Sequence, residues 1–145
     1  MGKKRIVKKT ENSDDSSSKS SASAKRLSKK RIEAGILYVR STYNNTTLLL
    51  TDLKGNAIGA SSSGALGFKG AKKGTPFAAS KAAEVLAEKA EQVGMKKVDV
   101  IIKGVGSGRE SSVRSFISKG IQLNSLKDMT PVPHNGPKPP KPRRV

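Results

Sequence analysis

The last seventeen residues limit how much of this chain can fold. Residues 129–145 contain six of the seven prolines in the sequence, together with four Lys or Arg residues. Proline fixes φ and removes the backbone N–H donor, so this segment cannot form a helix or a central strand. An extended, proline-rich segment is cheap to order against a partner, and its cations require that partner to be negative. We therefore predict a basic, extended C-terminal tail over residues 129–145.

The whole chain is strongly basic, with 29 Lys and Arg against 11 Asp and Glu and a net charge of +18. A compact protein of this size tolerates such a charge when its surroundings neutralise it, and a polyphosphate is the expected neutraliser.

Residues 1–33 are basic and Ser-rich with few apolar side chains, so we predict that they are disordered. The basic run at 25–31 is typical of nucleic-acid contacts, solvated tails and nuclear-targeting signals, and the sequence does not separate these.

Composition argues against several classes of protein. No apolar run approaches the ~20 residues of a membrane span, and Ile6 stands where a myristoylation signal needs Ser or Thr. The absence of cysteine excludes disulfides and Cys-based zinc sites. The single histidine, His134, lies in the proline-rich tail, where a Ser-His-Asp triad is not expected. We predict a cytoplasmic protein with no enzymatic activity, cofactor, metal or small-molecule substrate.

Residues 34–128 are predicted to form one α/β domain. Strand-like runs at 35–41, 46–52 and 57–61 are separated by turn residues and predict an antiparallel meander. Thr75 and Pro76 begin a helix whose small apolar residues recur at helical spacing until Gly94. A strand at 98–103, a helix at 111–119 and a strand at 121–127 follow. Two strand–helix–strand crossovers after a meander predict a mixed five-stranded sheet with two packed helices.

Two glycine-rich loops each lead into a predicted helix. Residues 61–74 contain four glycines and three lysines, and residues 104–110 contain three glycines and Arg109. Glycine lets backbone donors approach phosphate closely, and a helix N-terminus adds a positive dipole. Neither loop fits a nucleotide motif, because no Gly-Lys-Ser/Thr closes a Walker spacing and Arg109 replaces the last dinucleotide-motif glycine. We expect one phosphate-binding surface at one end of the sheet; an ordinary flexible loop is the alternative for residues 61–74.

Five ordered motifs resemble those of the eleventh small-subunit ribosomal protein family, in its bacterial type. The resemblance covers about residues 25–145, and the motifs lie at 43–46, 52–56, 67–79, 103–110 and 130–136. It implies a ribonuclease-H-like α/β fold without the nuclease's acids, and a place on the platform of the small ribosomal subunit. There the family bridges ribosomal RNA helices and borders the cleft that holds the Shine-Dalgarno duplex of messenger RNA.

The same resemblance implies neighbours that include the seventh and eighteenth small-subunit proteins. It places the protein in a ribosome, cytoplasmic or organellar. The Ser- and Asp-rich stretch at 11–24 is longer than the usual N-terminus of the family, so no family function is assigned to it. A ribonuclease-H-like nuclease and a DNA architectural protein are the alternatives from other classes.

The charge pattern and the resemblance together give a set of predicted RNA contacts. Phosphate contacts supply affinity, and the shape of the RNA supplies most of the specificity. Phe68 can stack on a base, although loop phenylalanines more often fold back onto their own domain. The predicted RNA-binding residues are Lys29, Lys30, Arg31, Asn44, Asn45, Lys69, Gly70, Lys72, Lys73, Gly106, Arg109, Arg114, His134, Asn135, Lys138, Lys141, Arg143 and Arg144.

Asn135-Gly136 indicates a second kind of chemistry in the tail. Glycine has no side chain to hinder attack of its backbone nitrogen on the asparagine amide, which is the route to isoaspartate. Pro133 and Pro137 restrict the backbone on both sides of the pair. Isoaspartate at Asn135 is therefore a hypothesis, and an unmodified turn is the alternative.

Overall fold

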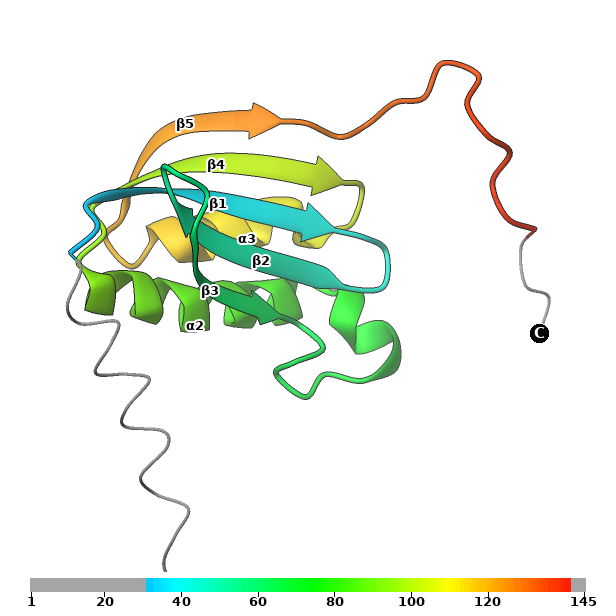
Figure 1. Cartoon of the computed structure of the whole chain (residues 1–145). Helices are drawn as coiled ribbons and strands as arrows, with labels where there is room; N and C mark the ends of the chain where they lie inside the picture. The colour runs from blue at the N-terminus through cyan, green and yellow to red at the C-terminus, as the bar shows by residue number, and fades with distance from the viewer. Residues whose placement is uncertain (1–30, 142–145) are drawn as a thin grey trace, which may run out of the picture.

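The computed structural model describes residues 31–141 (Figure 1). Lys29, Lys30, Arg143 and Arg144 lie outside the described residues, as do residues 1–30 of the segment 1–33 that was predicted to be disordered. The elements in chain order are β1 (Ala34–Ser41), β2 (Thr46–Asp52), β3 (Ala57–Ser62), the 3-10 helix η1 (Gly70–Gly74), α2 (Pro76–Val93), β4 (Lys97–Gly104), α3 (Gly108–Ile117) and β5 (Gln122–Asp128). Within residues 31–141, neither α-helix combines the length and apolar character needed to cross a bilayer.

The five strands form one mixed sheet in the order β3-β2-β1-β4-β5. β1 pairs antiparallel with β2 and parallel with β4, while β2 and β3 are antiparallel and β4 and β5 are parallel. The predicted mixed five-stranded sheet is therefore confirmed. Because β1, β4 and β5 run in the same direction, their C-terminal ends share one end of the sheet, where β3 also ends (Figure 1).

Both α-helices cover the same face of the sheet (Figure 1). The buried residues of β1 alternate with less buried ones, and Leu37 and Val39 pack beneath the helices with Leu86 and Phe116. The buried face of α2 is mostly alanine, which lets the helix lie close to the strands. Thr75 caps α2 by accepting a hydrogen bond from the Ala78 N–H at 3.3 Å, as predicted for an N-cap.

Three details of the predicted elements were wrong. Helix α3 begins at Gly108 and not at Ser111, because Gly108 is buried against neighbouring elements. The loop before α2 contains the helical turn η1, which the sequence analysis missed. Ile32 packs on the core, and its N–H donates to the Val93 carbonyl at 3.2 Å, so the folded part begins before residue 34.

Close backbone packing brings the connections at one end of the sheet together. A Cβ added at Gly104 would overlap the backbone carbonyl oxygen of Ser41. In the same way, a Cβ at Gly106 would overlap that of Thr42, and a Cβ at Gly74 would overlap that of Tyr43. These three residues end β1 and begin its turn into β2. The glycines of the two loops therefore serve mainly to dock both loops on the β1–β2 turn.

We predict that Gly106→Ala lowers the free energy of unfolding by about 1–3 kcal/mol, because its methyl group meets the Thr42 carbonyl oxygen. Urea denaturation measures the change. Gly64→Ala is the matched control: neither glycine has a positive φ, and a Cβ at Gly64 lies at an ordinary 3.6 Å from Lys73 Cδ. The control is expected to change stability by less than about 1 kcal/mol. If both substitutions change the free energy of unfolding equally, close packing is not the reason for glycine at position 106.

Candidate nucleic-acid interface

Three connections meet at the C-terminal end of β1, and we call this region the loop end. They are the β1–β2 turn (residues 42–45), the segment between β3 and α2 (residues 63–75) and the β4–α3 loop (residues 105–107). Ser107 Oγ donates to the Gly74 carbonyl oxygen at 2.7 Å, which joins the two glycine-rich loops. The Gly64 N–H donates to Asn45 Oδ1 at 3.2 Å, which joins the first loop to the turn. The expectation that both loops lie at one end of the sheet is confirmed.

Three predicted phosphate ligands lie together at this loop end. Lys69 and Lys72 are exposed and Lys73 is half-buried, and η1 carries Lys72 and Lys73 in its last turn. Residues 31–141 form two ion pairs, Lys81–Glu84 and Arg109–Asp128, and neither uses these lysines. Asn44, at the tip of the β1–β2 turn, is also exposed. The loop end thus presents cationic charge from a segment that is docked onto the sheet.

Phe68 folds back onto its own domain. Its ring lies edge-on to Phe77 of α2, with 6.1 Å between centroids and an interplanar angle of 87°. The Lys81 ammonium lies 5.8 Å from the Phe77 ring centroid. The Phe68–Phe77 contact holds the lysine-bearing loop against the first turn of α2, and the Lys81–Phe77 contact lies within that helix.

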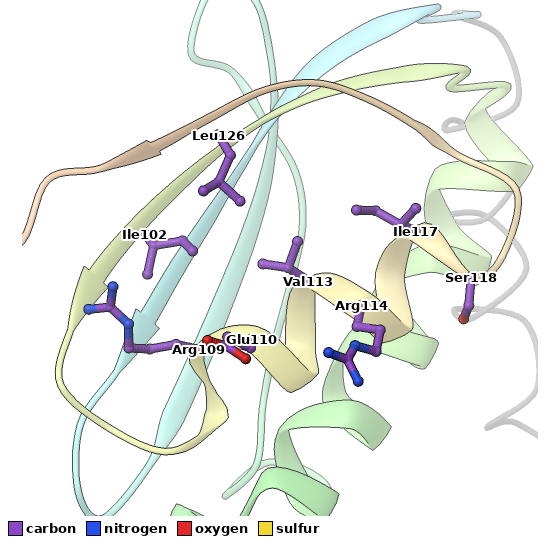
Figure 2. Close-up of a pocket in the computed structure, with 8 residues that line it drawn as sticks. All are labelled: Ile102, Arg109, Glu110, Val113, Arg114, Ile117, Ser118 and Leu126. Carbon is purple, nitrogen blue, oxygen red and sulfur yellow. The ribbon is translucent and has the colours of Figure 1, made fainter.

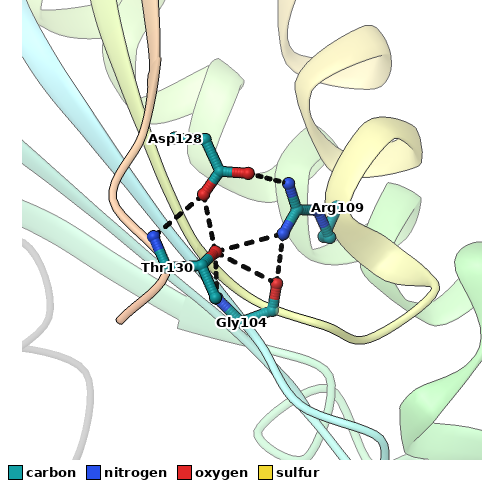
Figure 3. Close-up of polar contacts among 4 residues, drawn as sticks. All are labelled: Gly104, Arg109, Asp128 and Thr130. Carbon is teal, nitrogen blue, oxygen red and sulfur yellow. Dashed lines mark hydrogen bonds and ion pairs between the residues drawn. The ribbon is translucent and has the colours of Figure 1, made fainter. Parts of the chain in front are cut away.

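Arg109 joins the β4–α3 loop to the start of the C-terminal tail (Figure 3). Its guanidinium forms an ion pair with Asp128 and donates to the Gly104 carbonyl oxygen and, at 3.2 Å, to Thr130 Oγ1. Asp128 Oδ1 also accepts from the Thr130 hydroxyl at 2.6 Å and the Thr130 N–H at 2.9 Å. We call Gly104, Arg109, Asp128 and Thr130 the tail latch. The guanidinium is bonded within the protein, which gives Arg109 a positioning role, and its predicted phosphate contact stays a prediction.

Two further predicted RNA contacts are used to shape the loop end. The Gly106 N–H donates to the Ser41 carbonyl oxygen at 3.1 Å, so this amide is not free for phosphate. Asn45 accepts from Gly64 through Oδ1 and lies 3.4 Å from Thr47 Oγ1 through Nδ2. Both residues therefore position the loops, and their predicted RNA contacts stay predictions.

Two predicted contacts lie away from the loop end. Arg114 lines a groove of about 670 Å³ between α3 and β5, with Ile102, Val113, Ile117 and Leu126 among its walls (Figure 2). Arg31 lies at the opposite end of the sheet, in a hollow with Glu33 and Glu91 near the C-terminus of α2. The structure therefore divides the predicted cations among separate surfaces.

The C-terminal tail leaves the domain directly after the tail latch (Figure 1). The Met129 N–H donates to the Ile102 carbonyl oxygen at 2.8 Å, and residues 131–141 are exposed. Asn135 has a φ of 52° and is the one non-glycine residue with a positive φ among residues 31–141. His134, Lys138 and Lys141 also lie along this exposed segment.

Sequence reasoning missed Asp128 and Thr130. Their spacing carries a local signal, because an Asp side chain readily accepts the backbone N–H two residues later. The partner Arg109 is nineteen residues from Asp128 along the chain, and no local pattern reveals that contact. Within the part of the chain that the structure describes, no three Asp, Glu or His side chains gather as potential metal ligands.

A comparison with protein families finds a match over residues 35–144, to the family described as ribosomal protein S11. The matched range begins in β1 and extends to residue 144 in the C-terminal tail. It contains all five motifs singled out in the sequence.

Asp128 gives a pH-dependent test of the tail latch. Hydrogen bonds from Thr130 and then from Arg109 lower the pKa of Asp128 from its usual 3.8 to about 2. The latch is therefore complete above about pH 4 and is lost as the pH falls through about 2. We expect Thr130→Val and Arg109→Ala each to raise the pKa of Asp128 towards 3.8 in a carboxyl-carbon NMR titration.

Asp52 is the control in the same titration. Hydrogen bonds from Asn56 lower the pKa of Asp52, and this group lies at the end of β2, away from the latch. Its titration should be the same in wild type and both variants. An unchanged Asp128 titration in both variants would contradict the latch.

Proposed function

Because the chain belongs to the ribosomal protein S11 family, we propose that its loop end and C-terminal tail bind and bridge helices of small-subunit ribosomal RNA. Membership makes it a small-subunit ribosomal protein that takes part in translation, in a family that is structural and typically binds ribosomal RNA. The observation that carries the proposal is the placement of Lys69, Lys72 and Lys73 on a loop docked at the same end from which the tail leaves.

The loop end suits phosphate binding because its cations are fixed before the partner arrives. η1 sets the spacing of Lys72 and Lys73, the Phe68–Phe77 contact holds the loop, and Ser107 joins it to the β4–α3 loop. A docked loop loses less conformational entropy on binding than a mobile one. The lysines supply salt-dependent affinity, while the fixed outline of the loop end selects the shape of the RNA.

The tail supplies a second, more distant set of cations. Lys138 and Lys141 stand on an exposed proline-rich segment whose base is fixed by the tail latch. At about 3.1 Å per residue, an extended segment over 130–141 reaches up to about 34 Å from the domain. Cations at both the loop end and such a tail can contact two RNA helices at once. We extend this reading to Arg143 and Arg144, which lie outside the described residues.

We propose the position of the protein within the small ribosomal subunit from the family resemblance. We place the protein on the platform of the small subunit, beside the Shine-Dalgarno cleft and the seventh and eighteenth small-subunit proteins.

Local hydrogen bonds support a non-catalytic role over a nuclease. Asp52 is bonded to Asn56, Asp99 to Asn124 and Ser125, and Asp128 to Thr130 and Arg109. Metal-dependent RNA cleavage by the purified protein would favour the nuclease, and equal affinity for duplex DNA would favour a DNA architectural protein.

The central test is the salt dependence of affinity for a small-subunit ribosomal RNA transcript. We expect the triple variant Lys69→Gln, Lys72→Gln, Lys73→Gln to bind more weakly and to lower the slope of log K against log salt by about 2–3. A matched control replaces three exposed lysines elsewhere by Gln: Lys54, Lys89 and Lys96. The control should change the slope by less than about 1. A wild-type affinity that is flat with salt, or equal losses in both variants, would refute the proposed interface.

We also propose that Asn135 is converted to isoaspartate in part of the assembled protein. Its positive φ and the neighbouring Gly136 place the pair in a bent segment, and a β-linked backbone there redirects the tail. Peptide mapping of protein from assembled subunits should find an isoaspartyl peptide at 135, and Gly136→Ala should reduce its amount. Recovery of intact asparagine alone would rule the modification out.

A further inference from the structure

The face of the sheet opposite the helices carries a surface that the proposed function does not use. Within residues 31–141, both α-helices lie on one face, and no helix covers the other (Figure 1). Leu37 and Val39 of β1 are buried beneath the helices, so the alternate residues Tyr38 and Arg40 belong to the uncovered face. The same alternation places Leu49 of β2 and Ile101 of β4 there.

The strand register sets these side chains in two adjacent rows. Tyr38 of the central strand is paired with Leu49 on one side and Ile101 on the other. Two residues further along, Arg40 is paired with Thr47 and Lys103. Tyr38, Arg40, Thr47, Leu49, Ile101 and Lys103 line a shallow cavity of about 270 Å³. We call these six residues the open-face surface.

The first row is a platform for a flat apolar group. Tyr38, Leu49 and Ile101 are each half-buried by their neighbours in the sheet, so the ring and its apolar flanks are held in place by the strands. An aromatic side chain fixed on a sheet can stack on a nucleic-acid base, because every base has a π-face. Base–aromatic stacking of this kind requires an unpaired base, since duplex bases are stacked on one another.

The second row supplies charge of the sign that RNA requires. Arg40 and Lys103 are exposed beside the platform, and Lys127 of β5 pairs with Ile101 at its far side. The acid on this face of β4, Asp99, accepts hydrogen bonds from Asn124 at 2.7 Å and from Ser125 at 2.6 Å. The charge around the aromatic platform is therefore net positive, which favours a polyanion over an apolar protein partner.

We propose that the open-face surface binds a single-stranded segment of RNA, with one base stacked on Tyr38 and the flanking phosphates on Arg40 and Lys103. The inference rests on the proposed function and adds a second RNA surface to it. Arg40 directly precedes Ser41, at which β1 enters the loop end. The open-face surface therefore adjoins the loop end.

The test measures binding of an unstructured oligouridylate of about twelve nucleotides to the full chain. Tyr38→Ala should weaken binding at least fivefold, the lower end of the effect of removing one stacked base, and Tyr38→Phe should retain it. Leu53→Ala is the control, since Leu53 is exposed in the β2–β3 turn. Thermal denaturation checks that the variants are folded. Photo-crosslinking with 4-thiouridine should give adducts in β1 of the wild-type protein.

Two results would overturn the inference: unchanged oligouridylate binding by folded Tyr38→Ala, or crosslinks from Tyr38 to a protein in assembled subunits. The second result would identify the surface as a protein interface. The triple variant with Gln at positions 69, 72 and 73 distinguishes a failure of the open-face inference from a failure of the proposed function. If that variant loses affinity for ribosomal RNA while Tyr38→Ala does not affect oligouridylate, only the open-face inference fails.

Discussion

The packing of glycine backbone on the end of β1 determines where every functional segment lies. Gly74 precedes α2, while Gly104 and Gly106 connect β4 to α3, and all three lie against residues 41–43 where no Cβ fits. This contact fixes the start of α2, the direction of α3 and the position of Arg109 in the tail latch. The basic loop and the basic tail therefore depend on a contact that carries no charge itself.

The cations of this domain fall into two groups with different physical tasks. Arg109 is a positioning residue, since its planar guanidinium reaches Asp128, Thr130 and the Gly104 carbonyl oxygen at the same time. Lys69 and Lys72 are exposed, and neither takes part in the ion pairs formed within residues 31–141. Exposed ammonium groups on a docked loop suit contacts with RNA phosphates.

Local sequence signals predicted the elements but not the contacts between distant segments. Strand alternation in β1 and β2, and the Thr75 cap with Pro76, are set by neighbouring residues, so these elements were predicted nearly to the residue. The start of α3 was missed because Gly108 is drawn into the helix by packing against Thr46 and Ala79, far away in sequence. The contacts of Arg109 with Asp128 and Thr130 were missed for the same reason. The sequence predicted the position of the basic loop. It did not predict which nearby side chains form hydrogen bonds within the protein, because those bonds join segments that are distant in sequence.

The exposed edge strand β5 could pair with another copy of the protein, and the net charge opposes this pairing. All seven residues of β5 are exposed, including Leu123 at 42% and Leu126 at 54%, and such an edge is a template for pairing with another chain. Between synthesis and incorporation, the charge of +18 makes copies of the protein repel one another. Neutralisation by a polyanion then removes that repulsion. The same charge that draws the protein to its site thus acts beforehand as protection against self-association.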